Sequence, residues 1–196
     1  MKITKRDKTE AARAVARFDG KKSLEDIFYN LCFAILAPQT TFKSNIKAVA
    51  TLREIDFYKN DVDLPRLHDV VRSTRFFRQK SDRLLRAKKQ YLKILDVIFA
   101  EEESIEKRRR LVKMVKGIGM KAGSHLLRNL GHKDLAIIDT HVIKYLKCEQ
   151  PKNTRDYLRI EETFVKTAKQ YNMTPAELDA VVWKKYSNTP WEDFIY

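Results

Sequence analysis

The stretch LVKMVKGIGMKAGSHLLRNLGHKDLAIIDTHVIKYLK, residues 111–147, decides the fold of this chain. Gly117 and Gly119 interrupt its helical pattern, because glycine allows backbone angles and close approaches that other residues do not. Apolar side chains spaced three and four residues apart then predict a helix over residues 120–130, and Gly131 predicts its end. The stretch is therefore expected to form two helices joined by a tight hairpin.

The hairpin is predicted to bind an anion. Backbone N–H groups around Gly117 and Gly119 and at the start of the following helix are not used inside that helix, so they can hold a phosphate. Lys116 adds a positive charge beside them. These residues are candidates for contacts to a nucleic-acid backbone.

Two further residues carry candidate chemistry. Lys121 lies in the first turn of the second helix, where the positive end of the helix dipole disfavours the charged ammonium form and so favours a nucleophilic amine. Asp139, eighteen residues later, precedes the apolar positions of another helix and is a favoured N-cap residue type. Alone, a helix lysine and a capping aspartate are ordinary features of a helical protein.

Together these residues resemble a known family. The segments GIGMKAGSHLLRN (117–129) and AIIDTH (136–141) resemble the helix-hairpin-helix, glycine-rich loop and aspartate motif of base-excision DNA glycosylases. The lysine position and the aspartate spacing resemble the bifunctional members, which also have lyase activity. SHLLRN (124–129) most resembles the second, largely archaeal branch of 8-oxoguanine DNA glycosylases.

The resemblance implies a site and a partner. Lys121 would be the Schiff-base nucleophile, and Asp139 would stabilise the positive charge that develops on the sugar as the base leaves. Ser124 and His125 would take part in DNA binding, as members of the family signature. The implied partner is double-stranded DNA that contains a damaged base or an abasic site.

Two positions outside the hairpin also have a role in the resembled enzymes. Gln39 lies between two predicted helices, where the plain interpretation is a turn with Thr40 or Thr41 as N-cap. The resemblance implies instead that Gln39 enters the duplex and fills the gap left by the flipped base. Trp183 is either a core residue or the aromatic that stacks on the extruded base in the base pocket.

Composition agrees with a nucleic-acid partner. The chain has 40 Lys and Arg against 26 Asp and Glu, a formal net charge of +14, which favours a polyanion. No uncharged apolar run of about 18 residues predicts a membrane span, and the N-terminus lacks the apolar core of a secretory signal. We expect an intracellular monomer in the cytoplasm or nucleoid.

Cys32 and Cys148 are isolated in the sequence, and the four histidines lack metal-ligand spacing. The sequence therefore predicts no disulfide framework, no metal site and no cofactor. This separates the chain from relatives of the same superfamily that carry a four-iron cluster.

The expected fold is all-α, because glycine and proline are few and alternating β-type runs are missing. The resemblance implies the helix-hairpin-helix DNA glycosylase fold, with two helical lobes flanking a cleft. The lobes are predicted as residues 38–131, which contain the hairpin, and residues 1–37 with 132–196. Asp82 to Phe99 is expected to form one long helix. Together, residues 1–196 are expected to form a single catalytic domain.

The function expected from the resemblance is a bifunctional glycosylase and lyase for an oxidised purine, with 8-oxoguanine first. In the resembled branch the chain ends soon after the helix of Trp183 with a lysine that takes part in recognition. Here an aromatic tail, residues 191–196, continues instead, and it either replaces that lysine or covers the last helices. The alternatives are a non-catalytic DNA-binding module, a monofunctional glycosylase, and a glycosylase of the same fold for another base.

Overall fold

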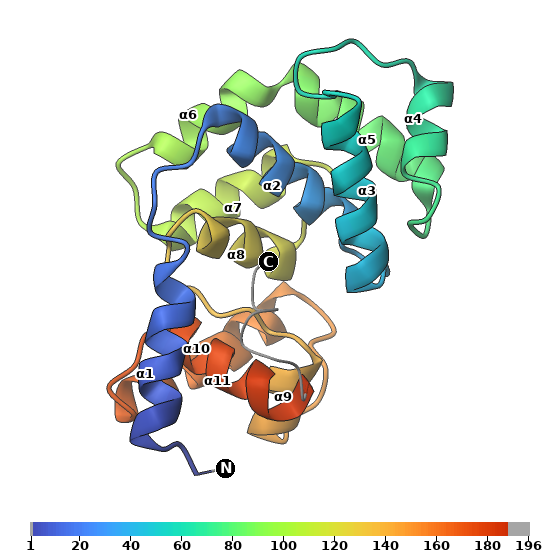
Figure 1. Ribbon diagram of the computed structural model, residues 1–196. Coiled ribbons are helices and arrows are strands. Elements are labelled where there is room, and N and C mark those ends of the chain that lie inside the picture. The colour runs from blue at the N-terminus through green and yellow to red at the C-terminus, as the bar shows by residue number, and fades with distance from the viewer. Residues whose placement is uncertain (1, 188–196) are drawn as a thin grey trace. The chain divides into compact units, whose positions relative to one another are not determined.

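The computed structural model describes residues 2–187, and this part of the chain consists of helices and connections without a strand (Figure 1), which confirms the all-α prediction. The helices are α1 (Lys5–Ala16), α2 (Leu24–Leu36), α3 (Phe42–Glu54), α4 (Leu64–Val70), α5 (Phe77–Lys89), α6 (Tyr91–Phe99), α7 (Ser104–Met114), α8 (Met120–Asn129), α9 (Thr140–Leu146), α10 (Thr154–Gln170) and α11 (Pro175–Ser187). The predicted tail, residues 191–196, lies outside the described residues.

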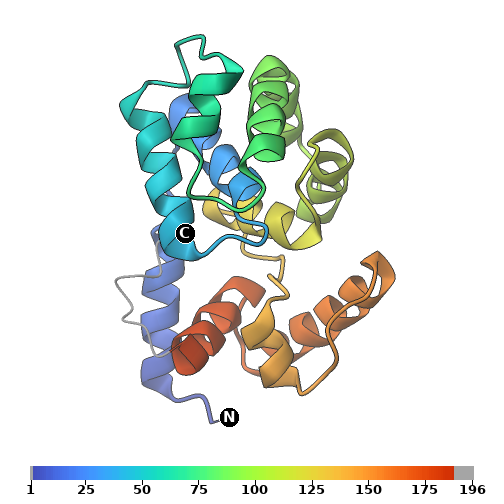
Figure 2. The same cartoon turned by 90° about the vertical axis from the view of Figure 1, so that its right-hand side faces the viewer.

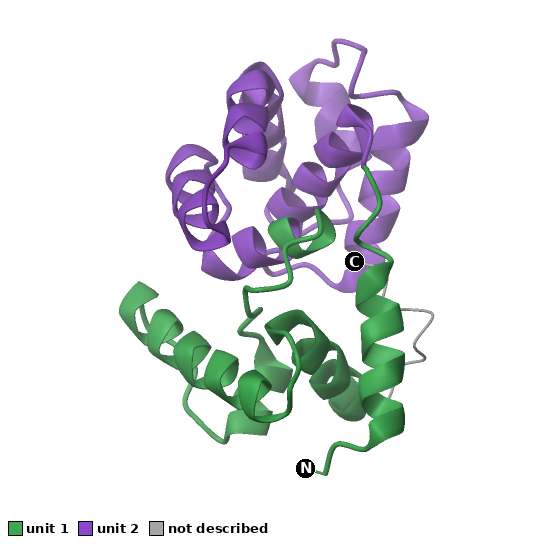
Figure 3. Cartoon of the chain, turned by 90° about the vertical axis from the view of Figure 1, so that its left-hand side faces the viewer, with its two compact units in different colours: residues 1–21, 127–196 green, residues 22–126 purple. Residues whose placement is uncertain are grey.

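The chain forms two compact units (Figure 3). Unit 2 contains residues 22–126, and unit 1 contains the chain before residue 22 and after residue 126. The lobes expected from the sequence, 38–131 and 1–37 with 132–196, differ from this division in where they place α2 and the end of α8. The lobe assignment stays a prediction.

Unit 2 is built around α2, which packs against α3 and α5 (Figures 1 and 2). Every α2 residue from Ile27 to Leu36 except Asn30 is buried, so this helix is apolar nearly all round and belongs in a core. Its start is fixed by Ser23, whose hydroxyl oxygen accepts a hydrogen bond from the Asp26 N–H at 3.0 Å.

The prediction of one helix from Asp82 to Phe99 was wrong. The structure has α5 and α6, separated at Gln90, whose backbone leaves helical geometry with φ −105° and ψ 16°. The Gln90 side-chain amide donates to the Met114 carbonyl oxygen at 3.3 Å, a contact 24 residues away in sequence. No glycine or proline marks this break, so only the tertiary packing determines it.

Unit 1 packs α11 against α1, α9 and α10. α11 starts with a capping box: Thr174 Oγ1 accepts from the Glu177 N–H at 3.2 Å, and Glu177 Oε2 accepts from the Thr174 N–H at 2.7 Å. Thr4 and Asp7 form the same reciprocal pair at the start of α1. The core between α1 and α11 contains small apolar side chains such as Ala14, Val15 and Ala180, together with the larger Phe18 and Met173.

No helix in the part of the chain that the structure describes combines the length and the apolar character needed to cross a bilayer.

Candidate active site

The hairpin between α7 and α8 is fixed by apolar side chains on its inner side. Val115 and Ile118 are buried, and the Ile118 N–H donates to the Val115 carbonyl oxygen at 3.2 Å. Gly117 between them has φ +99°, a conformation that glycine adopts without a steric cost. A Cβ atom on Gly119 would meet nothing within 4 Å, so this face of the hairpin is open to a ligand.

Gly117 also lies against a side chain of another helix. A Cβ atom at this position would lie 2.6 Å from Cδ of Arg83, a side chain of α5. Arg83 therefore lies directly against the hairpin backbone and adds a guanidinium charge next to its N–H groups. Sequence analysis did not identify Arg83 as a candidate site residue. Lys116, which precedes Gly117, is exposed.

Lys121 is the second residue of α8, and it is exposed. The opposite side of α8 is fixed against α7, where a Cβ atom on Gly123 would lie 3.0 Å from Arg108 Cγ. Arg108 Nη1 also donates to the Ser124 hydroxyl at 2.7 Å. The buried contacts to α7 thus leave the amine of Lys121 accessible from solvent.

The two signature residues after Gly123 are more buried than a DNA-contacting role implies. Ser124 has an exposed fraction of 0%, so a direct contact to DNA would need α8 to move away from α7. His125 is half-buried and packs edge-on against the Phe33 ring, with 5.6 Å between ring centroids. Both contacts fix α8 within unit 2.

Asp139 lies in unit 1 and caps α9, as its position predicted. One carboxylate oxygen, Oδ1, accepts hydrogen bonds from the His141 N–H at 2.8 Å and the Val142 N–H at 2.9 Å. The carboxylate is half-buried and lies at the positive end of the helix. These contacts fix the orientation of the carboxylate.

A buried cation lies behind Asp139 in the same unit. Arg128 is 3% exposed, its Nη1 lies 3.4 Å from Asp179 Oδ2, and its guanidinium stacks on Phe18 with 5.0 Å to the ring centroid. Burial lowers the pKa of Arg128 to about 10, against the opposing attraction of Asp179 and Asp139. Sequence analysis included Arg128 in the signature segment 124–129, but it did not predict the pairing with Asp179, which lies 51 residues away in the sequence.

Gln39 lies in the connection between α2 and α3 in unit 2. It is exposed and has φ 53°, the left-handed region that residues other than glycine seldom adopt. Of the two threonines predicted as N-cap, Thr41 has this role, and its Oγ1 accepts from the Ser44 N–H at 3.2 Å.

Lys80 of α5 is the main residue of this region that sequence reasoning missed. Its side chain is 1% exposed, and its amine donates to acceptors on both sides of Gln39. One signal was available: Lys80 lies four residues before the buried Leu84, on the apolar stripe of its helix.

Trp183 is half-buried in unit 1 and packs against the core between α1 and α11. Trp183 therefore has a structural role in the packing of unit 1. Its assignment to a base pocket stays a prediction.

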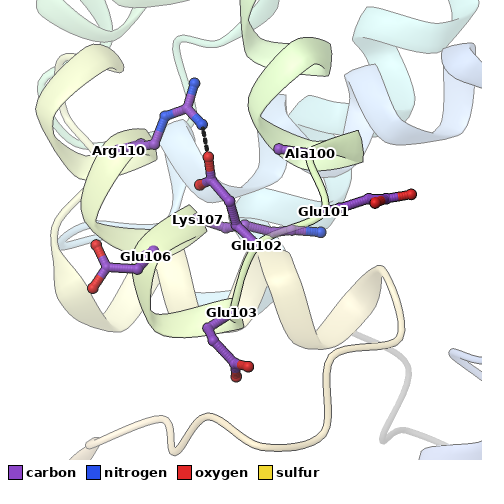
Figure 4. Close-up of a pocket in the computed structure, with 7 residues that line it drawn as sticks. All are labelled: Ala100, Glu101, Glu102, Glu103, Glu106, Lys107 and Arg110. Carbon is purple, nitrogen blue, oxygen red and sulfur yellow. Dashed lines mark hydrogen bonds and ion pairs between the residues drawn. The ribbon is translucent and has the colours of Figure 1, made fainter.

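The acidic depression beside α7 is not a candidate for DNA binding. The depression is lined by Glu101, Glu102, Glu103 and Glu106 around Lys107 and Arg110, and Glu102 pairs with Arg110 (Figure 4). Four carboxylates repel a polyanion, so this surface is unsuited to DNA. Within residues 2–187, no three His, Cys, Asp or Glu side chains are grouped so that they could hold a metal ion.

Comparison with known proteins decides the family. A sequence model described as 8-oxoguanine DNA glycosylase matches residues 9–173, most of the chain. The chain belongs to the 8-oxoguanine DNA glycosylase family. This confirms the resemblance seen in the hairpin and aspartate segments.

Relatives and solved structures with the same description support this family assignment. An 8-oxoguanine DNA glycosylase/AP lyase of Picrophilus torridus is 32% identical over 163 residues, 80% of this chain and 77% of the relative. That of Methanocaldococcus jannaschii is 32% identical over 173 residues, 83% and 81% of the two chains. The crystal structure of the Methanocaldococcus jannaschii enzyme with a 15mer DNA containing 8-oxoguanine has a TM-score of 0.80 and 29% identity, covering 94% of this chain and 91% of that chain.

For a chain of the 8-oxoguanine DNA glycosylase family, each unit supplies a distinct set of candidate residues. Unit 2 carries the hairpin, Lys121 and the Gln39 turn, and unit 1 carries Asp139 and Trp183. Hydrogen bonds from N–H groups of α9 fix the Asp139 carboxylate, whereas the Lys121 side chain is exposed on α8.

Proposed function

We propose that this chain is a bifunctional DNA glycosylase and AP lyase that excises 8-oxoguanine from double-stranded DNA and cleaves the strand at the resulting site. The observation that carries the proposal is the family match over residues 9–173, which includes a lysine and an aspartate of the types this reaction needs. An exposed amine at Lys121 and a fixed carboxylate at Asp139 support it.

Lys121 supplies the nucleophile. Its neutral amine attacks C1′ of the damaged nucleotide, and the C1′–N bond to the base breaks with its electron pair leaving on the base. Loss of the nitrogen proton and opening of the sugar ring give an imine. The imine acidifies the 2′ hydrogen, and removal of that proton expels the 3′ phosphate by β-elimination.

Asp139 stabilises the transition state. Bond breaking at C1′ leaves positive charge on the sugar, and a fixed carboxylate lowers the energy of that charge without reorganising at the moment of reaction. The two N–H groups bound to Oδ1 orient the carboxylate and leave its second oxygen for the substrate.

The remaining predicted residues bind and present the DNA. The N–H groups at Gly117 and Gly119, with Lys116, bind a backbone phosphate, and Arg83 adds charge at the same place. Gln39 fills the gap in the duplex when the base is extruded. His125 supports this surface through the position of α8, and Trp183 is proposed to stack on the extruded base.

The partner is duplex DNA with an oxidised purine or an abasic site, bound by a monomer. Such an enzyme works on chromosomal DNA, in the cytoplasm or nucleoid of the cell, without a membrane. No cofactor enters the proposed steps, since the amine and the carboxylate supply the chemistry.

Borohydride trapping tests the proposal directly. The protein is incubated with duplexes that each carry one lesion, and sodium borohydride reduces any imine to a stable covalent complex. We expect trapping and strand cleavage with the 8-oxoguanine duplex. Lys121→Gln should abolish both while affinity for the duplex stays near the parental value.

Lys113→Gln is the matched control, because Lys113 is also an exposed lysine near the hairpin, in the last turn of α7. This variant should trap at the parental level. Trapping by Lys121→Gln at the parental level would remove Lys121 from the mechanism. Binding without excision of any lesion would leave a non-catalytic DNA-binding module.

A further inference from the structure

The Gln39 turn is strained and yet well defined. The Thr40 N–H donates to the Ala37 carbonyl oxygen at 3.1 Å, so residues 37–40 form a four-residue turn with Pro38 second and Gln39 third. A positive φ at the third position is typical of type II turns, where glycine or asparagine is usual. Gln39 has φ 53° there, which persists only if the surroundings hold it.

Those surroundings are the ammonium group of Lys80. Its Nζ donates to the carbonyl oxygens of Leu36 at 2.7 Å and Pro38 at 2.8 Å, and to the Thr40 hydroxyl at 2.5 Å. The acceptors lie on both sides of Gln39, which itself is exposed. Burial, with repulsion from Arg83, lowers the pKa of Lys80 to about 8, so at pH 7 the amine is mainly protonated and has one hydrogen for each acceptor.

The contact with Leu36 has its own physical basis. Leu36 is the last residue of α2, and the final carbonyl groups of a helix have no partner inside the helix. A buried cation satisfies such a carbonyl and interacts favourably with the negative end of the helix dipole. Lys80 thus joins the end of a buried core helix to the turn that follows it.

We infer that Lys80 is a positioning residue for Gln39, holding the 37–40 turn in the strained conformation that presents the Gln39 amide to the duplex. This rests on the proposed function, in which Gln39 fills the gap left by the flipped base. Lys80 itself is buried, so it acts through the turn and does not touch the DNA.

Lys80→Met tests the inference, since methionine keeps an unbranched apolar chain and removes the donors. The single-turnover excision rate on an 8-oxoguanine duplex should fall by up to about 100-fold, the loss that a misplacement of about 1 Å can cause. Lys107→Met is the control: Lys107 is also buried and donates to one carbonyl oxygen, that of Ile98 at 2.9 Å, but lies in α7 beside the depression in Figure 4. This control should keep the parental rate.

A double-variant cycle separates positioning from general stability. If Lys80 acts through Gln39, Gln39→Ala should lower the rate about as much as Lys80→Met, and the double variant should lose no more than the worse single variant. Multiplied losses in the double variant would overturn the inference, and so would a parental rate for Lys80→Met.

Hydrogen exchange supplies a readout that does not depend on activity. Lys80→Met should speed amide exchange in residues 39–41, and Lys107→Met should not. Thr40→Val removes one acceptor and serves where Lys80→Met fails to fold; it should change exchange and excision in the same direction by a smaller factor. Unchanged exchange would overturn the inference. A parental protein that excises no oxidised purine would refute the proposed function. The exchange measurement would still test whether Lys80 holds the 37–40 turn.

Discussion

Asp139 has a structural and a proposed chemical role, and two substitutions separate them. Asp139→Asn keeps an oxygen that can accept from the His141 and Val142 N–H groups, now 2.8 and 2.9 Å from Oδ1. It removes only the charge at the helix start, which costs about 0.3–1 kcal/mol of stability. Asp139→Ala loses both hydrogen bonds, and the loss of such a cap costs about 0.5–2 kcal/mol.

Excision should respond differently from stability. Both variants lack the carboxylate, and the removal of one preorganised charge-stabilising group lowers a catalytic rate by about 100- to 1000-fold. Single-turnover excision of 8-oxoguanine, together with urea unfolding followed by circular dichroism, measures the two effects separately. Asp139→Asn should therefore lose excision with little loss of stability, and it should still bind the damaged duplex.

Asn153→Ala is the control for the cap. Asn153 caps α10 in the same unit, and its Oδ1 accepts from the Asp156 N–H at 2.9 Å. This variant should lose stability comparable to that of Asp139→Ala and keep the parental excision rate. Asp139→Asn at the parental rate would refute a role in the chemistry, and equal excision losses in both alanine variants would assign the effect to stability alone.

Three further outcomes are expected. Arg128→Met and Asp179→Leu should each lower the free energy of unfolding by about 3–5 kcal/mol, and the double variant by far less, because each single change leaves a buried charge that has lost this ion pair. Additive losses in urea unfolding would contradict this. With Ellman's reagent, Cys148, which is half-exposed, should react in the native protein, while Cys32, buried and with its pKa raised by burial, should react only in denaturant. The logarithm of the affinity for duplex DNA should fall linearly with the logarithm of the salt concentration. An affinity that does not change between low and physiological salt would exclude a DNA partner.

Local patterns predicted the local structure well. The hairpin glycines, the Asp139 cap and the Thr174 to Glu177 capping box each depend on residues within a few positions of one another, so the sequence specifies them. The break at Gln90 could not be predicted in this way. It accompanies a hydrogen bond to Met114, and the residues around it favour a continuous helix.

Sequence analysis could propose candidate site residues only where a residue type stands in a motif that indicates its chemistry. Lys121 and Asp139 fall in a recognisable motif, whereas Lys80 differs from other lysines only in its burial. Ser124 shows the same limit, since the signature gives its residue type but not its burial, and its hydroxyl accepts a hydrogen bond from Arg108 in the interior. Sequence alone gives the type of a side chain and leaves its exposure to the tertiary fold.

Buried cations change what the net charge of +14 means for DNA binding. Lys80, Lys107, Arg108 and Arg128 are all buried, and the first three fix helix ends or helix pairs through hydrogen bonds to carbonyl or hydroxyl oxygens. These buried charges form hydrogen bonds inside the protein and do not contact phosphates, so they release no counterions from DNA. Because the slope of log affinity against log salt is about −0.9 for each phosphate neutralised, it should report the exposed residues at the hairpin and not the total charge. Neutralising exposed Lys116 should therefore reduce the slope by about one, whereas Lys107→Met should leave it unchanged, although each removes one positive charge.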